Sequence, residues 1–208
     1  MLKGKNLEFQ YPQGKKIIFP DLTIEQGQTG LLLGESGSGK TTLLHVLSGL
    51  RKPTSGKVEY NDVDLYQLNT SQRDQFRGKN IGLIFQTSAF IHSLTILENL
   101  MVPLYLNHEF QDQHKAKHLL EKVGLFHKIN KRPFELSIGE QQRISIIRSV
   151  IQSPKMILAD EPTSALDDKN ANQVISLLLD ISEENQSSLL VVTHDHRWKS
   201  FIHKTIQL

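Results

Sequence analysis

Apolar residues along this chain gather into short runs, separated by longer stretches with helical spacing. Four runs have the length and flanking turn residues of buried strands, at positions 31–33, 81–85, 156–159 and 189–193. Residues 41–50 are predicted to form a helix, with Gly49 and then Pro53 as its termination signals. Residues 169–183 are predicted to form another. Strands that alternate with helices in this way predict an α/β fold with a mainly parallel sheet.

The N-terminal part of the chain predicts a second, smaller layer. Residues 7–9, 17–19 and 22–24 have the composition of short strands, and turn residues flank the strand-like segment 57–60. We interpret these pieces as an antiparallel β subdomain that accompanies the parallel core.

A helical insertion is predicted between the second and third core strands. The helical pattern runs from about position 92 to 152, with expected interruptions at Pro103, Gly124 and Pro133. We expect one domain over residues 1–208, in which 1–85 and 153–208 form the core with its β subdomain. Residues from about 86 to 152 form the inserted α-helical subdomain.

Composition narrows the class of protein. The 208 residues carry a net charge of +2 without a long basic block, which argues against a nucleic-acid partner. The chain has no cysteine, so disulfides and thiolate metal sites are excluded. No secretory signal and no apolar run of about 18 residues is present, so we expect a cytoplasmic protein without direct membrane insertion.

A glycine-rich loop follows the strand at 31–33 and opens the helix at 41–50. It matches the pattern G-x-x-x-x-G-K-[ST], whose backbone N–H groups cradle phosphates at a helix N-terminus. Lys40 is expected to contact the β- and γ-phosphates, and the Thr41 hydroxyl to bind Mg²⁺. The predicted phosphate-binding residues are Gly34, Glu35, Ser36, Gly37, Ser38, Gly39, Lys40, Thr41 and Thr42. This loop predicts a P-loop nucleoside triphosphatase core but does not separate ATP from GTP.

Two further strands end in ionisable residues. Asp160 and Glu161 follow the strand at 156–159, and His194 follows the strand at 189–193. Because parallel strands place their carboxyl ends at one edge of the sheet, all three should face the phosphate loop. Asp160 suits the magnesium ion, and Glu161 suits the orientation or deprotonation of the attacking water. An acidic pair or a lone histidine at a strand end is otherwise an ordinary surface feature.

The sequence Leu-Ser-Ile-Gly-Glu-Gln-Gln-Arg at 136–143 begins another predicted helix. Ser137 and Glu140 have the spacing of a capping box, which is a purely structural role. The segment also resembles the LSGGQ signature of ABC ATPases and lies shortly before the acidic strand, as it does in that family. This resemblance implies that Ser137, Gly139 and Glu140 contact the ATP held by the phosphate loop of a second copy, in a homodimer.

The resemblance covers nearly the whole chain and implies further roles. Gln86 resembles the glutamine that contacts Mg²⁺ and the attacking water, so Thr41, Gln86 and Asp160 form the expected metal site. Asp167 resembles the residue that crosses to the second subunit, and His194 the histidine that contacts the γ-phosphate. Tyr11 occupies the place of the aromatic residue that stacks on adenine; it also suits a half-buried strand. The catalytic set implied is Glu161, His194, Gln86 and Lys40.

Two positions depart from the family signature. Ile138 replaces its first glycine, and a side chain there could crowd the loop or restrict its backbone angles. Glu140 replaces its glutamine and brings a negative charge toward phosphate unless the side chain turns back to cap the helix.

The function predicted is that of an ATP-binding and hydrolysing subunit of an ABC transporter, peripheral on the inner face of the cell membrane. It would energise a transmembrane permease on a separate chain, which we expect to dock around Gln86 and residues 86–110. There Phe90, Ile91 and Leu94 belong either to the core of the helical arm or to a docking groove. The strings at 81–86, 94–99 and 158–163 resemble the lipoprotein-release, macrolide-export and cell-division branch.

Other functions remain open from the sequence. An ABC ATPase without a transported solute, acting on a signalling partner in cell division or cell-wall remodelling, has a similar short subunit. A GTPase is disfavoured because Asn130-Lys131 is followed by Arg132-Pro133 and not by the aspartate of the guanine-binding motif. The sequence does not indicate the cargo or the direction of transport.

Overall fold

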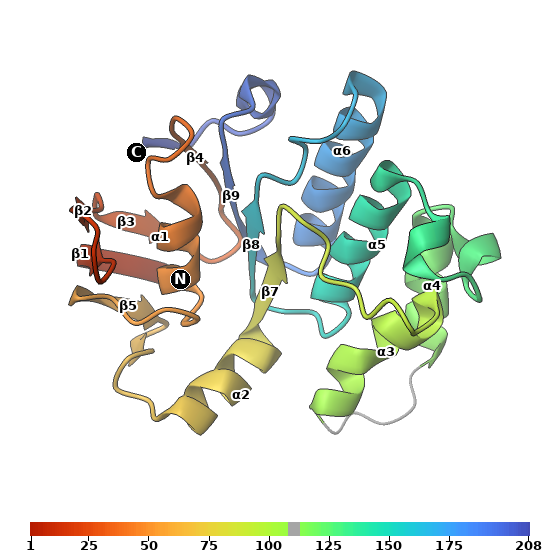
Figure 1. Cartoon of the computed structure of the whole chain (residues 1–208), viewed down its shortest axis with the longest axis horizontal. Helices are drawn as coiled ribbons and strands as arrows, with labels where there is room; N and C mark the ends of the chain where they lie inside the picture. Colours follow the sequence, from red (N-terminus) through yellow and green to blue (C-terminus); the bar gives the residue numbers. More distant parts are fainter. Residues whose placement is uncertain (108–112) are drawn as a thin grey trace.

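The structure is a computed structural model that describes residues 1–107 and 113–208. The described residues form two five-stranded sheets and the helices around them (Figure 1). The strands are β1 (Leu2–Gln10), β2 (Lys16–Ile18), β3 (Leu22–Ile24), β4 (Thr29–Leu33), β5 (Ser55–Tyr60), β6 (Val63–Asp64), β7 (Ile81–Ile84), β8 (Met156–Asp160), β9 (Ser188–Thr193) and β10 (Thr205–Gln207). The α-helices are α1 (Lys40–Leu47), α2 (Thr70–Asn80), α3 (Ile96–Leu106), α4 (Gln113–Lys122), α5 (Ile138–Val150) and α6 (Asp168–Glu184). Short 3₁₀-helices are η1 (Phe126–Lys128), η2 (Pro133–Glu135) and η3 (His196–Ser200).

The central sheet has the strand order β10-β4-β9-β8-β7, and all of its neighbouring strands are parallel. The central strands β8 and β9 are buried on both faces, which explains their continuous apolar runs, whereas the edge strand β10 is largely exposed. Successive residues point to opposite faces, so Leu31 and Leu33 enter one apolar cluster and Leu32 the other. The parallel α/β prediction is confirmed.

The second sheet is antiparallel and is built around β1, which pairs with β2, β3 and β5. Asn61 and Asp62 form the turn between β5 and β6 with φ angles of 44° and 69°, a conformation that asparagine and aspartate tolerate better than most residues. Helix α1 lies between the two sheets (Figure 1). The predicted N-terminal antiparallel layer is therefore present.

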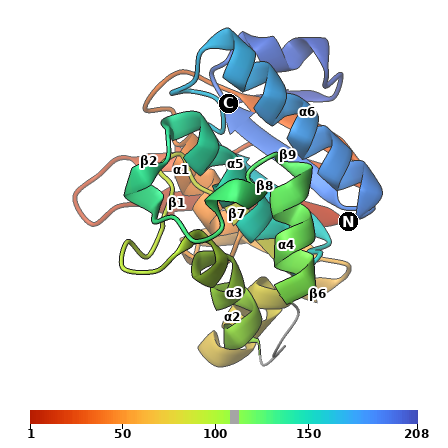
Figure 2. The ribbon, with the colours of Figure 1, turned by 90° about the vertical axis from the view of Figure 1, so that its right-hand side faces the viewer.

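Helices α3, α4 and α5 lie between β7 and β8 in the sequence and form the right-hand side of the molecule in Figure 1. Figure 2 shows α3 and α4 on the outer side of α5. Their apolar residues, including Leu100 and Leu120, belong to the same buried cluster as Ile157 of β8 and Leu178 of α6. No helix within the described ranges is long and apolar enough to span a membrane.

Two details of the helical pattern differ from expectation. Pro103 lies inside α3 and does not interrupt it, because burial of Leu100, Met101 and Leu104 outweighs the cost of a proline in a helix, about 3 kcal/mol. Helix α2 was not predicted. It buries none of its residues and is defined by a capping box between Asn69 and Gln72.

Candidate active site

The phosphate loop connects β4 to α1 with two glycines in left-handed conformations. Gly37 has φ 82° and Gly39 has φ 98°, which favours glycine at both positions. A Cβ atom on Gly34 would lie 2.8 Å from Oγ of Ser38, so the loop closes tightly on itself. Lys40 is buried, and its Nζ donates hydrogen bonds to the carbonyl oxygens of Gly34 at 2.9 Å and Glu35 at 2.8 Å.

A cavity of about 380 Å³ opens above this loop at the carboxyl edge of the central sheet. Most of the residues predicted at the phosphate loop and at the strand ends line this cavity. The lining residues are Tyr11, Ile17, Ser36, Gly37, Gly39, Lys40, Thr41, Thr42, Gln86, Glu161 and His194. Five segments distant in sequence therefore converge on one polar cavity.

Glu161 is the most constrained ionisable residue of the cavity. Its backbone adopts φ 47°, an unfavourable conformation for a non-glycine residue. Its carboxylate lies 3.5 Å from Nζ of Lys40 and 2.8 Å from Nδ1 of His194. Burial raises the pKa of the Glu161 carboxyl, but hydrogen bonds from Thr193 and His194 outweigh burial and leave the pKa below its ordinary value. The carboxylate form is thus the stable one.

Thr193 holds this carboxylate and was missed by the sequence analysis. Its hydroxyl donates to Oε2 of Glu161 at 2.6 Å, and the side chain is fully buried. Its position could have indicated this role, because Thr193 is the last residue of β9 and immediately precedes His194.

Asp160 is buried next to the phosphate loop. Its Oδ1 has no hydrogen-bond partner within residues 1–107 and 113–208, an unusual condition for a buried carboxylate. Burial raises the pKa of Asp160, the Thr41 hydroxyl lowers it in part, and the nearby Glu161 charge raises it further. The unsatisfied carboxylate oxygen lies near the Thr41 hydroxyl, and Thr41 and Gln86 both line the cavity; together they form an oxygen-rich donor set, which suits a hard divalent cation such as Mg²⁺. The residues present therefore fit a magnesium ion that also binds phosphate oxygens.

Tyr11 lies at the rim of the cavity and is 38% exposed. Its hydroxyl is 2.8 Å from the Thr42 hydroxyl, and its ring packs edge-on against Phe9. The Arg51 guanidinium lies 5.6 Å from the ring centroid. The position suits a stacking platform with a cation already beside it.

The segment at 136–143 begins α5 with a complete capping box. Ser137 Oγ accepts from the backbone N–H of Glu140 at 3.3 Å, and Oε2 of Glu140 accepts from the backbone N–H of Ser137 at 2.8 Å. The Glu140 side chain thus turns back onto its own helix, and Lys128 lies 3.8 Å from its other oxygen. The backbone hydrogen bond from Ser137 lowers the pKa of Glu140, so the side chain is charged.

The departures at this segment have a clear structural outcome. Ile138 lies in the first turn of α5 with its side chain 64% exposed, and it is not among the described residues with a positive φ. It neither crowds nor strains the loop within this chain. Gly139 packs closely against α6, because a Cβ there would lie 2.8 Å from Oδ1 of Asn170 and the Asn170 side chain would have to shift.

Seven predicted nucleotide-binding residues are not among those that line the cavity, and three of them, Gly34, Glu35 and Ser38, belong to the phosphate loop itself. Ser137, Gly139 and Glu140 lie at the start of α5, and Asp167 caps α6 by accepting from the backbone N–H of Asn170 at 2.9 Å. Within one copy of the chain, Ser137, Gly139, Glu140 and Asp167 do not line this cavity, whereas Ile138 and Gln141 of α5 line a second hollow together with Gln86 and Glu161.

Comparison with known proteins places this geometry in a family. The family described as "ABC transporter" matches residues 20–164. The lipoprotein-releasing system ATP-binding protein LolD of Hydrogenovibrio crunogenus is 40% identical over 214 residues, spanning 100% of this chain and 93% of that protein. LolD of Legionella pneumophila is 42% identical over 179 residues, spanning 85% of this chain and 79% of that protein.

Solved structures agree with this assignment. A dimeric, post-hydrolysis ATP-binding cassette, MJ0796 bound to ADP and Pi, has a TM-score of 0.91 and 34% identity and covers 100% of this chain and 94% of its own. The cbiO1 subunit from Clostridium perfringens shares the fold, with a TM-score of 0.82 at 24% identity over 93% of this chain and 78% of that chain. This chain belongs to the ABC transporter family, as an ATP-binding subunit that hydrolyses ATP.

Proposed function

We propose that this subunit energises a lipoprotein-releasing transport system, as a homodimer that acts on separate transmembrane subunits at the cytoplasmic face of the membrane. The observation that supports this best is the 40% identity with a LolD protein over the whole of this chain. The same branch was indicated by the sequence strings at 81–86 and 158–163.

In this proposal, the loop N–H groups and Lys40 bind the β- and γ-phosphates of ATP. Thr41, Gln86 and Asp160 hold Mg²⁺, which supplies charge neutralisation at the phosphate oxygens. Glu161 orients the attacking water and accepts its proton, and the lowered pKa of its carboxyl keeps it in the carboxylate form at neutral pH. His194 contacts the γ-phosphate and, with Thr193, fixes the Glu161 carboxylate.

A second copy completes the site. Ser137, Gly139 and Glu140 do not line the cavity of their own chain, and a helix N-terminus attracts phosphate through its free N–H groups. Placed against the cavity of a partner copy, the start of α5 supplies the missing wall for the γ-phosphate. The dimeric assembly of MJ0796, 34% identical to this chain, supports this arrangement.

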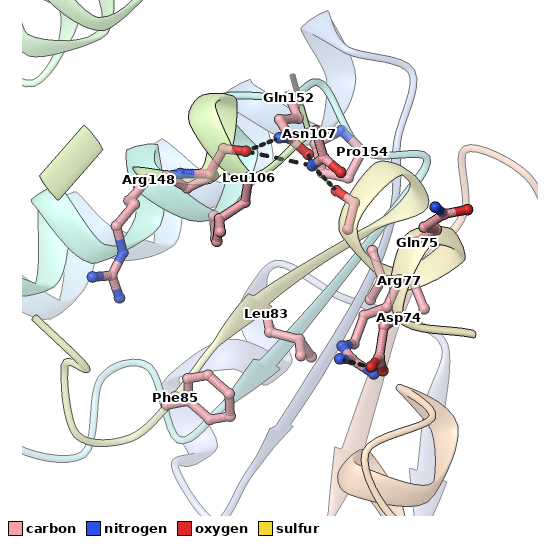
Figure 3. A pocket seen from close by; sticks show the side chains of 14 residues that line it. Asp74, Gln75, Arg77, Leu83, Phe85, Leu106, Asn107, Arg148, Gln152 and Pro154 are labelled. Carbon is pink, nitrogen blue, oxygen red and sulfur yellow. Dashed lines mark hydrogen bonds and ion pairs between the residues drawn. The ribbon is translucent and has the colours of Figure 1, made fainter. Parts of the chain in front are cut away.

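The transmembrane partner docks in a groove between α2, α3 and α5, shown in Figure 3. The groove has a volume of about 570 Å³. Apolar side chains from β7 and α3 line it, and Arg148 of α5 lies at one side. Its residues are Asp74, Gln75, Arg77, Gly78, Ile81, Leu83, Phe85, Pro103, Leu106, Asn107, Arg148, Ser149, Gln152 and Pro154. This size and mixed lining suit a short amphipathic helix of the partner.

The groove extends beyond the predicted docking region, because α2 and α5 also contribute to it. Phe90, Ile91 and Leu94 do not line the groove. Phe90 is buried in the core of the arm, with the Arg148 guanidinium 4.9 Å from its ring centroid. Leu106, at 75% exposure, is the apolar side chain most open to a partner.

Steady-state hydrolysis by the purified chain tests the catalytic part of this proposal. We expect Glu161→Gln to abolish turnover while ATP binding persists, and magnesium removal with EDTA to abolish turnover in the wild type. A Glu161→Gln variant that hydrolyses ATP at the wild-type rate overturns the role assigned to Glu161.

Co-purification tests the transport part. We expect tagged chain to capture transmembrane subunits from its native membrane, and reconstituted complex to release a lipoprotein only with ATP. Leu106→Glu should abolish this capture and leave basal hydrolysis unchanged. Capture of a partner that handles no lipoprotein, such as one acting on cell-wall hydrolases, contradicts the lipoprotein assignment.

A further inference from the structure

The side chain of Arg197 joins three segments around the candidate active site. It lies in η3, three residues after His194, and its Nε donates to both carboxylate oxygens of Asp195 at 2.9 Å. Its Nη1 donates to Oδ1 of Asp168 at 2.8 Å, and its Nη2 to the carbonyl oxygen of Thr163 at 3.3 Å. Arg197 therefore connects the end of β9, the turn after β8 and the first residue of α6.

A continuous set of hydrogen bonds runs from this guanidinium to the Glu161 carboxylate. Asp195 accepts from Oγ1 of Thr163 at 2.6 Å, and its backbone N–H donates to Oγ1 of Thr193 at 3.0 Å. The Thr193 hydroxyl in turn donates to Oε2 of Glu161 at 2.6 Å. Thr163 and Thr193 are fully buried. If Asp195 shifted, their hydroxyl groups would lose hydrogen-bond partners that water could not replace.

The network is anchored by Trp198, the neighbour of Arg197. The indole of Trp198 is fully buried, and its Nε1 donates to Oγ1 of Thr163 at 3.1 Å. This contact fixes η3 against the turn after β8. The Trp198 contact consequently keeps Arg197 close to His194 even if the contact between Arg197 and α6 is lost.

The two halves of the Arg197 bridge differ in exposure. The Asp195 side chain is 10% exposed, whereas the Asp168 side chain is 91% exposed. Ion pairs open to water are weak and exchange readily, whereas the Asp195 contact is bidentate and charge-assisted. The contact between Arg197 and α6 is thus the weaker of the two and can change more easily. Asp168 directly follows Asp167, which by its resemblance to the family's residue is expected to reach the second copy.

We propose that Arg197 is a positioning residue that couples the start of α6 at the dimer interface to His194 and Glu161 at the hydrolytic centre. This inference rests on the proposed dimeric ATPase. Arg197 touches neither nucleotide nor water in this assignment; it sets the placement of the groups that do. Loss of the coupling should slow the chemical step and leave ATP binding intact.

The test measures kcat and KM for ATP with the full chain, at protein concentrations where the rate no longer depends on dimerisation. We expect Arg197→Ala to lower kcat about tenfold with KM within about twofold of the wild type. Asp168→Asn should lower kcat about threefold, and Asp168→Glu should restore it because a longer carboxylate still accepts from Arg197. The double variant Arg197→Ala/Asp168→Asn should be no slower than Arg197→Ala alone. Lys199→Ala is the matched control, since it removes a positive charge from the same short helix at an exposed position.

Asp168→Asn keeps the proposal testable if Arg197→Ala does not fold, because the Asp168 side chain is almost entirely in water. A wild-type kcat in Asp168→Asn overturns the coupling, as does additivity of the two substitutions. A parallel rise in KM and fall in thermal stability in Arg197→Ala, with Asp168→Asn unaffected, assigns Arg197 a structural role only. Failure of the wild-type chain to hydrolyse ATP overturns the proposed function instead, so the two failures are distinguishable.

Discussion

Nδ1 of His194 lies 2.8 Å from Oε1 of Glu161, and the backbone N–H of His194 donates to the same oxygen at 3.1 Å. One residue therefore holds the carboxylate with its main chain and its side chain together. The His194 side chain is largely exposed to the cavity, whereas the Glu161 side chain is buried. A group that is fixed at one end and open to the cavity at the other suits contact with a γ-phosphate.

We expect His194→Ala to lower kcat about 100-fold, because it removes the proposed phosphate contact and one of the bonds that orient Glu161. ATP affinity should change by less than about threefold, since Lys40 and the loop amides remain. Rapid-quench hydrolysis and equilibrium ATP binding provide the two measurements. The exposed neighbour His196 supplies the control variant, His196→Ala, whose rate should match the wild type. Equal rates in both alanine variants would refute the assignment of His194.

The negative charge of Glu140 should weaken closure of the ATP-bound dimer, because it would repel the phosphates bound by the second copy. A glutamine can still accept from the backbone N–H of Ser137, so Glu140→Gln preserves the capping box and removes one negative charge near the proposed trans phosphate. We expect ATP-dependent dimers formed in the Glu161→Gln background to bind about threefold to tenfold more tightly.

Analytical ultracentrifugation with ATP measures this change, and Glu135→Gln is the matched control. Glu135 makes the equivalent bond to the backbone N–H of Arg132 at 2.7 Å, one short helix earlier. An equal effect of both substitutions would show that general charge, and not the position of Glu140, governs closure.

Gly56 should tolerate no side chain. Its φ is 88°, and an added Cβ would lie 2.3 Å from the backbone oxygen of Asn6 on β1. We expect Gly56→Ala to lower the free energy of unfolding by about 3 kcal/mol, combining an unfavourable backbone angle with a clash against main chain. Gly27 has φ 70° with no atom within 4 Å of the added Cβ among the described residues, so Gly27→Ala should cost only about 1 kcal/mol. Urea unfolding of both variants separates the clash from the backbone angle, and equal losses would contradict the close approach.

Asp195 makes the free energy of unfolding depend on pH in the acid range. Burial raises the pKa of its carboxyl, but hydrogen bonds from Arg197 and Thr163 outweigh burial and lower the pKa from 3.8 to about 2. Because the pKa is lower in the folded state than in the unfolded chain, the charged form stabilises the fold above about pH 4, and this stabilisation is lost as the pH falls toward 2.

We expect Asp195→Asn to reduce the free energy of unfolding by about 1 kcal/mol at pH 7, a value discounted because Arg197 is partly in water. The difference from the wild type should shrink between pH 4 and pH 2. Urea midpoints across this range provide the measurement, with the exposed Asp180→Asn variant as control. A difference that stays constant down to pH 2 would contradict the lowered pKa.

The sequence sufficed for features whose signal is local. The phosphate loop depends on glycines that accept positive φ and on a lysine at a fixed distance along the chain, so Gly37, Gly39 and Lys40 could be identified without a structure. The capping role of Glu140 was likewise visible in its three-residue spacing from Ser137. The strand ends at Glu161 and His194 converge because parallel strands share an edge.

Features set by distant contacts could not be read from spacing. Pro103 remains helical because its neighbours are buried against residues more than 40 positions away, such as Ile144 and Ile147. Thr193 and Arg197 acquire their roles only when β8 and β9 lie side by side. Helix α2 gave no apolar periodicity at all, although Asn69 and Gln72 carried a capping signal that could have identified it.

The single apolar cluster that joins the sheet to α3 and α4 limits how the enzyme can move. Ile96 and Leu100 of α3 share buried contacts with the layer that contains Ile157 and Leu178, so the arm has no separate interior of its own. Melting of the arm alone would expose one side of the sheet to water. We therefore expect the arm to move by tilting of intact helices, and heat to unfold the chain in one cooperative transition.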